Sequence, residues 1–260
     1  MRKIGIRNNT LKLDLLDALA TAPKLGYDGV ELVVQQSAEI AQWLAPDGAR
    51  EILDACERNN CAVAALSCGT YREHHFALPD PAERRLGEQF VADCLRASRR
   101  LGAGAVLIPY FDWKNLDITP EQEQWHIESL RRCRPVVEET GVKLAIETSF
   151  TTAQLNRIID AVGSPLIGSY HDFANTLRLP DGPVASLRTL GSRVARIHLK
   201  DGSSTYENVP LGAGVVDWPA CRAAVDEVGY DDWFVLETPA GDDPIESARR
   251  NLAFVRAWLA

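Results

Sequence analysis

The sequence lacks the features that mark membrane, exported and nucleic-acid-binding proteins. No stretch of about 18 apolar residues occurs in the 260 residues, and the first residues, MRKIGIRNNTLKLDLL, contain no apolar export sequence. No run of five or six like charges is present, and the formal net charge of -8 disfavours a polyanionic partner. We therefore expect a cytoplasmic protein that acts neither at a membrane nor on nucleic acid.

Cysteine is present but follows no binding or disulfide pattern. Six cysteines are scattered through the chain, and no two form a CxxC pair. In a chain without an export sequence, this distribution predicts reduced thiols, with no disulfide and no zinc knuckle. The chain has no linker rich in proline, glycine and serine and no break in composition, so we expect one domain over residues 1–260.

What the sequence does contain is a regular alternation of short β-branched runs and longer segments with helical periodicity. A helical segment follows each run, which predicts an α/β protein built as a (β/α)8 TIM barrel. An open doubly wound sheet is the alternative, although no GxGxxG motif follows the first run. The predicted strands are residues 3–7, 28–34, 61–67, 105–110, 142–147, 166–172, 194–200 and 233–237.

Four ionisable residues stand where the last four predicted strands end. Glu147 follows KLAI, Asp172 follows LIGSYH, His198 follows VARI and Glu237 follows WFVL. The carboxyl ends of barrel strands meet at one face, where such barrels place their active sites. A strand-end salt bridge or a helix cap would explain each residue alone, but four in succession predict a common site.

A metal ion would resolve the electrostatic problem that this site creates. Three carboxylates in one place repel one another unless a cation compensates their charge. We therefore predict one divalent metal held by Glu147, Asp172, His198 and Glu237, with coordination positions left for two substrate oxygens. Oxygen-rich ligation favours Mn²⁺ or Mg²⁺, with Mn²⁺ first, and the imidazole also suits Co²⁺, Zn²⁺ or Fe²⁺.

These residues lie in longer segments that resemble a known family. The segments are LGYDGVEL (25–32), VKLAIETSFTTAQLN (142–156), YHDFAN (170–175), RIHLKDG (196–202), NVPLGAGVVDWPA (208–220) and GYDDWFVLET (229–238). Together they resemble the xylose-isomerase-like sugar isomerase/epimerase superfamily and are most similar to its L-ribulose-5-phosphate (L-xylulose-5-phosphate) 3-epimerases. The resemblance implies that the same four residues bind the metal. It also implies that Glu147 and Glu237 are the acid and base that act on a ketose or ketose phosphate through an enediolate.

The chain departs from two subgroups of this superfamily. The free-ketose 3-epimerases carry a histidine three residues after the metal aspartate and an arginine six after the metal histidine, whereas this chain has Asn175 and Ser204 there. The ribulose-phosphate type carries adjacent arginines beside a histidine in the loop after the third strand. Here that loop reads SCGTYREHHF, which leaves Arg72 as the candidate phosphate contact.

Further substrate contacts are predicted beside the metal ligands. Glu31 could bind a substrate hydroxyl or orient a metal ligand, or it could pair with an arginine such as Arg7. Lys200 could bind a substrate oxygen or phosphate, or form an ordinary strand-end salt bridge. Tyr110, at the end of the fourth strand, could form a wall of the pocket or pack in an aromatic core. Together with Arg72 and Asn175, these residues complete the predicted substrate site.

The other histidines are expected to lie outside the metal site. His74 and His75 occur in a polar loop at the predicted mouth, where one of them could contact substrate, although a pair of surface histidines is the favoured prediction. His126 lies in a predicted outer helix and should face solvent. His171 neighbours Asp172 in a strand, so its side chain should point the opposite way.

Several functions remain open from the sequence. The first is a metal-dependent isomerase or 3-epimerase of a ketose or ketose phosphate. The second is a metal-dependent lyase or dehydratase of a keto-sugar or keto-polyol on the same barrel. Apurinic endonucleases share this barrel, but they need a trinuclear zinc site with more histidines than the five present here. A fourth hypothesis is a binding protein that has lost its chemistry. Barrels of this family often pair, so a homodimer or homotetramer is expected.

Overall fold

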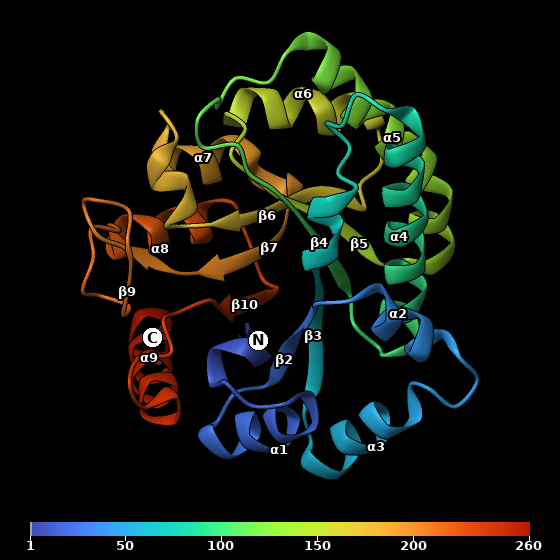
Figure 1. Cartoon of the computed structure of the whole chain (residues 1–260). Coiled ribbons are helices and arrows are strands. Elements are labelled where there is room, and N and C mark those ends of the chain that lie inside the picture. The colour runs from blue at the N-terminus through green and yellow to red at the C-terminus, as the bar shows by residue number, and fades with distance from the viewer. Residues whose placement is uncertain (1) are drawn as a thin grey trace.

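Eight short apolar runs form parallel strands that close into a barrel in a computed structural model, which describes residues 2–260 (Figure 1). Around the barrel the order is β1, β10, β7, β6, β5, β4, β3 and β2. The predicted (β/α)8 barrel is therefore confirmed, and the open sheet is excluded. The strands are β1 (Lys3–Arg7), β2 (Gly29–Val34), β3 (Ala62–Cys68), β4 (Ala105–Tyr110), β5 (Lys143–Thr148), β6 (Ile167–Asp172), β7 (Val194–Leu199) and β10 (Trp233–Leu236).

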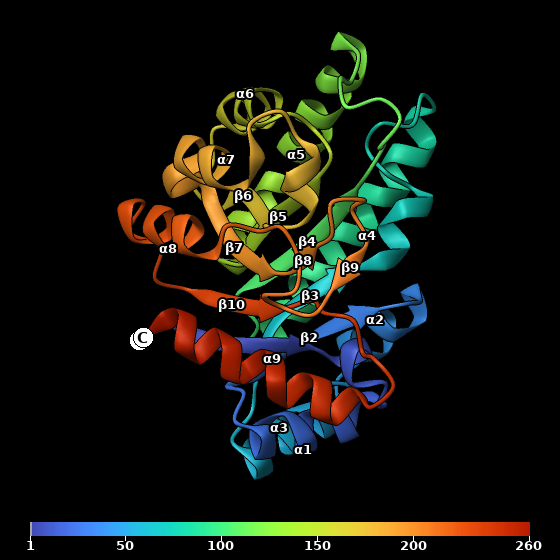
Figure 2. The same cartoon turned by 90° about the vertical axis from the view of Figure 1, so that its left-hand side faces the viewer.

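Helices surround the strands on the outside of the barrel (Figures 1 and 2). One of them, α2, was not predicted, because its short segment SAEIAQWL follows a strand within a few residues. None of the helices in residues 2–260 combines the length and the hydropathy of a membrane-spanning segment. The helices are α1 (Leu15–Leu25), α2 (Ser37–Leu44), α3 (Arg50–Asn59), α4 (Pro81–Arg100), α5 (Pro120–Thr140), α6 (Thr152–Val162), α7 (Gly182–Leu190), α8 (Trp218–Glu227) and α9 (Pro244–Leu259).

Local sequence signals set the ends of these helices. Thr119 caps α5 and Thr151 caps α6, each in a capping box with a glutamine three residues later. Gly141 and Gly163 end the same helices with φ of 66° and 69°, values that glycine adopts without strain. The chain therefore turns back toward the barrel at defined positions, and each following strand starts in register.

Apolar clusters lie on both faces of the strands. A large cluster joins the outward strand residues to the helices. A smaller cluster contains small strand residues and one tyrosine, as expected for side chains that alternate toward the barrel interior. Its members are Ala65, Ala105, Leu107, Ala145, Tyr170 and Ala195.

The strand order places four candidate residues beside one another. Strands β5, β6, β7 and β10 are consecutive neighbours in the barrel. Asp172 pairs with His198 in register, and His198 pairs with Val235, two residues before Glu237. Strand β10 ends at Leu236, so Glu237 lies just beyond it, and the Glu237 amide donates to Leu199 O at 3.1 Å. The carboxyl ends of these strands thus form one half of the barrel mouth.

Short elements follow β7 at this mouth. The strands β8 (Asp201–Gly202) and β9 (Asn208–Val209) pair as a small antiparallel hairpin. The 3-10 turns are η1 (Asn8–Leu11), η2 (Gly69–Glu73), η3 (Asn175–Arg178) and η4 (Gly191–Arg193). Turns η1, η2 and η3 begin within three residues of the ends of β1, β3 and β6, respectively, and so help to shape the rim of the mouth.

Candidate metal centre and active site

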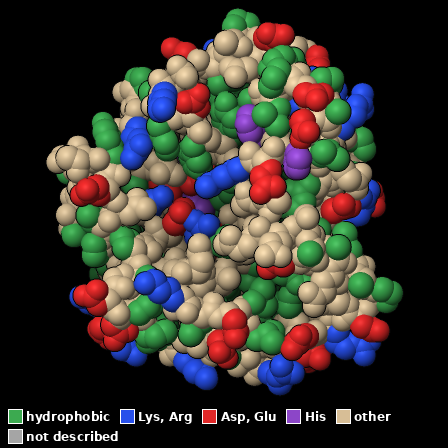
Figure 3. All heavy atoms as spheres, viewed as in Figure 1, with side chains coloured by type: hydrophobic (Ala, Val, Ile, Leu, Met, Phe, Trp, Pro, Cys, Tyr) green, Lys and Arg blue, Asp and Glu red, His purple; other side chains and the backbone are tan. Residues whose placement is uncertain are grey.

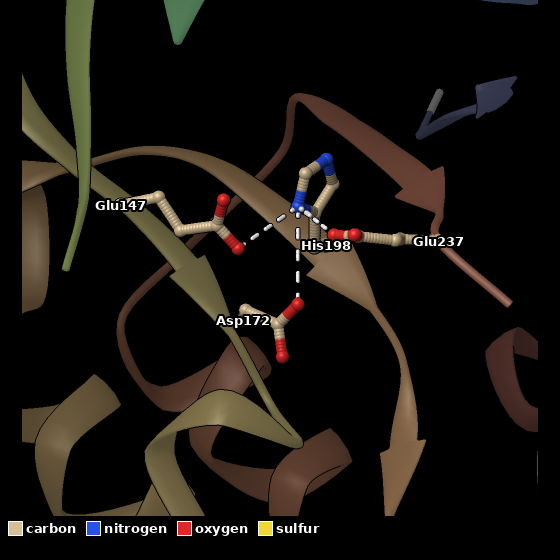
Figure 4. A group of neighbouring side chains, drawn as sticks. All are labelled: Glu147, Asp172, His198 and Glu237. Atoms are coloured by element: carbon tan, nitrogen blue, oxygen red, sulfur yellow. Dashed lines mark hydrogen bonds and ion pairs between the residues drawn. The ribbon is translucent and has the colours of Figure 1, made fainter. Parts of the chain in front are cut away.

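Glu147, Asp172, His198 and Glu237 converge at the barrel mouth (Figure 4). One ligand atom from each residue lies within 4.8 Å of those from the other three. Asp172 and His198 are fully buried, Glu147 is buried and Glu237 is half-buried. The structure thus brings together the four residues that the sequence selected as metal ligands.

His198 lies at the centre of the group. Its Nδ1 atom is 3.1 Å from Glu237 Oε2, 3.3 Å from Glu147 Oε1 and 3.9 Å from Asp172 Oδ2. Three carboxylates therefore face one imidazole nitrogen, as the dashed lines in Figure 4 show. One imidazolium proton cannot satisfy three carboxylates at once.

The geometry fits a divalent cation. Ligand atoms of one ion lie about 2.0–2.6 Å from it, so they also lie within a few ångströms of one another. Asp172 Oδ2 and Glu237 Oε2 are buried and accept no hydrogen bond of good geometry within residues 2–260. Buried carboxylate oxygens are normally hydrogen-bonded or bound to a cation. The donor set of three carboxylates and one imidazole suits an ion such as Mn²⁺.

The pKa values of the cluster reflect its surplus of negative charge. Burial raises the pKa of Asp172 to about 7, with Lys200 opposing the shift and Glu147 and Glu237 adding to it. Burial lowers the pKa of His198, but Glu31 and Glu147 outweigh this and hold it well above its usual value. The protein alone thus compensates the cluster by retaining protons on Asp172 and His198. Metal binding would displace such protons.

Glu31 lies on the other side of His198. The Nε2 atom of His198 is 3.2 Å from Glu31 Oε1, and Tyr170 Oη donates to Glu31 Oε2 at 2.5 Å. Glu31 also lies 3.3 Å from Arg7 Nε and has no exposed surface. Both the ligand-orienting role and the pairing with Arg7 agree with these contacts. Direct contact with a substrate hydroxyl does not fit the complete burial of Glu31.

Asn175 and Lys200 lie beside the carboxylates. Asn175 Nδ2 donates to Glu147 Oε1 at 3.0 Å, and its backbone N–H donates to Asp172 Oδ1 at 2.7 Å. Lys200 Nζ lies 3.6 Å from Glu237 Oε1 and 3.9 Å from Asp172 Oδ2. Asn175 therefore fixes two predicted ligands, and Lys200 brings positive charge close to two of them.

A cavity of about 210 Å³ opens above the cluster. Glu147, Glu237, Lys200 and Asn175 line it from the ligand side, whereas Arg72, Phe111 and Trp113 line it from the loops after β3 and β4. On the face shown in Figure 3, acidic and basic side chains meet around a hollow near the centre. The polar lining and the size suit a small polar molecule.

A second cavity of about 370 Å³ shares Arg72, Phe111 and Trp113 with the first. It is also lined by His75 and Tyr110, whose rings meet edge to face with centroids 5.1 Å apart. Tyr110 thus lines this outer cavity and not the cavity above the ligands. Arg72 is exposed and lies where the two cavities meet, and it forms no ion pair in residues 2–260.

Among the other histidines, one prediction was wrong. His126 is 2% exposed and packs against Tyr110 and Phe150, because its side of α5 faces the barrel and not solvent. His171 points away from the site, as expected, with Nε2 3.1 Å from Pro183 O. His74 pairs with Glu83 at 2.6 Å on the rim, and His75 is half-buried because it lines the outer cavity.

Arg7 was not predicted as a residue of the cavity. It is the last residue of β1, it lines the cavity above the cluster, and its Nη1 atom pairs with Glu237 Oε1. The rule that selected the four ligands, an ionisable residue at the end of a strand, also applies to Arg7. Sequence reasoning considered it only as a counterion for Glu31.

Comparison with known proteins places this chain in a family. The model of the xylose isomerase-like TIM barrel family matches residues 19–258. The chain is 23% identical over 258 residues to L-ribulose-5-phosphate 3-epimerase UlaE of Escherichia coli, covering 94% of this chain and 90% of that protein.

Solved structures show the same fold. A structure of L-ribulose 3-epimerase superposes with a TM-score of 0.83 at 21% identity, covering 100% of this chain and 95% of the other. The 3-keto-D-glucoside 4-epimerase YcjR of E. coli superposes with a TM-score of 0.82 at 18% identity, covering 99% and 100%. The match of the family model over most of the chain carries the assignment: this chain belongs to the xylose isomerase-like TIM barrel family.

Proposed function

We propose that the protein is a divalent-metal-dependent 3-epimerase or isomerase of a ketose or ketose phosphate. The observation that carries the proposal is the placement of two glutamates, Glu147 and Glu237, at one cavity and within one cluster of ligand atoms. The names of the relatives, which are sugar epimerases, support the same reaction class. In such a reaction the reacting centre is a carbon next to a ketone.

Glu147, Asp172, His198 and Glu237 would hold the metal, with Mn²⁺ as the first choice. When bound, the cation would supply positive charge beside the substrate carbonyl and so stabilise negative charge that develops on its oxygen. Glu31 keeps the His198 ring oriented through its contact with Nε2.

Proton transfer is the task of the two glutamates. Glu147 belongs to β5 and Glu237 follows β10, and two other strands separate them in the barrel. Their carboxylates therefore approach a substrate from different sides. One removes the proton next to the carbonyl, which leaves an enediolate, and the other returns a proton to the opposite face. An aldose–ketose isomerisation would need only one of them.

The cations around the cavity define the substrate contacts. Lys200, 7% exposed, would bind a substrate oxygen close to the reacting carbons. Arg72 lies farther out, between the two cavities, and would bind a phosphate at the far end of a ketose phosphate. Asn175 keeps Glu147 in place, and Tyr110 closes the outer cavity.

The test is solvent proton exchange. Metal-loaded protein is incubated in D₂O with pentuloses, hexuloses and their terminal phosphates, and the products are followed by NMR. We expect deuterium at C3 together with the C3 epimer. Glu138→Gln, which changes an exposed glutamate paired with Arg134 on α5, should leave the rate unchanged.

Other outcomes of this assay would redirect the proposal. Deuterium at C1 with formation of an aldose would establish isomerisation. Loss of water from the substrate would establish the lyase instead. No exchange with any member of the panel, despite bound metal, would contradict the proposed substrate class.

The proposal extends to the setting of the enzyme. We propose a cytoplasmic protein with one domain over residues 1–260, assembled as a homodimer or homotetramer. Light scattering coupled to size-exclusion chromatography would measure the assembly. A monomer at micromolar concentration would contradict it.

A further inference from the structure

Arg7 occupies a position that the proposed chemistry does not yet use. Its side chain is 14% exposed, lines the cavity and lies among acids. Nη1 pairs with Glu237 Oε1, and Nε lies 3.3 Å from Glu31 Oε1. Nε is buried and has no hydrogen-bond acceptor with good geometry in residues 2–260. The Arg7 guanidinium therefore lies between Glu237, a predicted metal ligand, and Glu31, the carboxylate that contacts the predicted ligand His198.

The two acids that Arg7 contacts, Glu31 and Glu237, face different nitrogen atoms of His198. Glu31 lies 3.2 Å from His198 Nε2 and accepts a hydrogen bond from Tyr170. Glu237 faces His198 Nδ1 at 3.1 Å through its other oxygen, Oε2. Arg7 thus links Glu237 directly, and His198 through Glu31, into one connected group.

The two oxygens of Glu237 have different surroundings. Oε1 contacts Arg7 and lies 3.6 Å from Lys200. Oε2 is buried, accepts no hydrogen bond of good geometry within residues 2–260 and faces the cluster. A carboxylate that is held at one oxygen cannot rotate freely, so the orientation of the other oxygen is fixed as well.

We infer that Arg7 is the positioning residue for Glu237: it holds Oε1 against the barrel wall so that Oε2 stays directed at the metal centre and the substrate. This inference rests on the proposed function, because Glu237 is one of its two acid/base groups. It adds a residue from β1 to a site whose predicted ligands come from the ends of β5, β6, β7 and β10.

An arginine suits this role better than a lysine. A guanidinium presents several N–H groups in a fixed plane, so it can contact two carboxylates at once, whereas an ammonium is a single point charge on a flexible chain. Arg7→Lys should therefore preserve the charge near the metal centre but not the orientation of Glu237.

The loss of Arg7 should affect the Mn²⁺ affinity and the rate of proton exchange differently. Removing the positive charge of Arg7 leaves more uncompensated negative charge beside the metal site, which favours Mn²⁺ binding, whereas a loosened Glu237 disfavours it, so the Mn²⁺ affinity of Arg7→Gln should change less than the rate. Losing the clamp on Glu237 should lower proton exchange by about 10–100-fold, the usual cost of losing a group that orients a ligand.

The experiment measures both quantities on the same proteins. Mn²⁺ affinity is measured by electron paramagnetic resonance, and kcat and KM for deuterium exchange are measured at saturating Mn²⁺ for the wild type, Arg7→Gln and Arg7→Lys. Arg2→Gln is the matched control, because Arg2 precedes the same strand and pairs with Asp226 at the surface. We expect a lower kcat with KM nearly unchanged in both Arg7 variants, and no change in Arg2→Gln.

Chemical rescue guards against a variant that merely folds poorly. Guanidinium added to Arg7→Ala should restore part of kcat, which a misfolded protein would not allow. A kcat within twofold of the wild type in Arg7→Gln would overturn the inference. A higher KM with unchanged kcat would also overturn it, because Arg7 would then bind substrate and not position Glu237.

The spectrum of bound Mn²⁺ separates this inference from the proposed function. If the wild type exchanges no proton with any ketose, the proposed function fails, but the spectrum still reports the ligands around the ion. A changed spectrum in Arg7→Gln, with Arg2→Gln unchanged, would support positioning of Glu237. An unchanged spectrum in Arg7→Gln would contradict it.

Discussion

The two ends of the barrel differ in how the charge of their acidic residues is compensated. At the end where the strands begin, Asp232 contacts Arg196 and lies 2.9 Å from Lys143 Nζ. Burial raises the pKa of Asp232, but Arg196 and Lys143 outweigh it and hold that pKa below its usual value. At the mouth, the pKa of Asp172 rises to about 7, because it is buried and faces Glu147 and Glu237. Asp172 ends its strand, is almost completely buried and faces other acids, whereas Asp232 directly precedes its strand, is 30% exposed and faces two bases.

The difference separates a structural charge cluster from a reactive one. At the start of the strands, Arg196 and Lys143 compensate the charge of Asp232. At the mouth, four acids share two strong bases, so part of their charge has no counterpart. Ionisable groups with shifted pKa values in a cavity are typical of functional sites. We therefore expect changes at one end to cost stability and changes at the other to cost activity.

The largest effect is expected from the two glutamates. Glu147→Gln and Glu237→Gln each remove an acid/base group while keeping the shape of the side chain. Proton exchange should fall by about 10²–10⁴-fold, the usual contribution of such a group. A rate within tenfold of the wild type would contradict the assigned role.

The opposite pattern is expected at the other end of the barrel. Asp232→Asn leaves the guanidinium of Arg196, which is 3% exposed, without its anionic partner. Asp232 itself is 30% exposed, so the loss should be about 2 kcal/mol of unfolding free energy, less than for a fully buried pair. Urea unfolding measures it. Exchange kinetics at saturating metal should be unchanged, and a large loss of kcat would break the comparison.

The pH dependence of stability should also distinguish the two ends. In the folded metal-free protein the pKa of Asp172 is raised from 3.8 to about 7, so its proton stabilises the fold at low pH. That contribution is lost as the pH rises from about 4 through about 7, and the raised pKa of His198 acts in the same direction at higher pH. We expect the thermal midpoint to fall between pH 6 and pH 8.5.

Saturating Mn²⁺ should abolish most of this fall, because the metal replaces the protons. Asp172→Asn, which carries no titrating group at that position, should show a weaker pH dependence than the wild type. A midpoint that rises with pH in the metal-free wild type would contradict the charge surplus at the mouth.

The smallest effect is expected at the rim. Arg72→Gln removes an exposed cation without an acidic partner in the described chain, so stability should change by less than about 0.5 kcal/mol. If Arg72 binds the substrate phosphate, KM for a ketose phosphate should rise about tenfold, whereas KM for the free ketose should not change. Equal effects on both substrates would remove the phosphate contact from the account.

Most of the barrel could be predicted from the sequence, because its signals are local. Strand residues such as KIGIR and AVLIPY are bounded by loops, and capped helices follow them at regular spacing. The four predicted metal ligands were also selected by a local rule, an ionisable residue where a strand ends, and the order of the strands in the barrel then brings them together. The extra helix α2 was missed because it is only eight residues long.

The contacts that depend on packing could not be predicted. His126 was predicted to face solvent from an outer helix, but its side of α5 packs against the aromatic rings of Tyr110 and Phe150. Arg7 and Glu237 are 230 residues apart, and only closure of the barrel between β1 and β10 makes them partners. Sequence periodicity indicates which face of an element is buried, but not which side chains meet there.

We propose above all that the mouth holds one divalent cation through these four residues. The most direct measurement is a Mn²⁺ titration of the wild type and Asp172→Asn, followed by electron paramagnetic resonance. We expect one bound ion per chain in the wild type and an affinity at least about 100-fold lower in the variant, since a charged ligand is lost. No bound Mn²⁺ in the wild type, or equal affinity in the two proteins, would contradict the account.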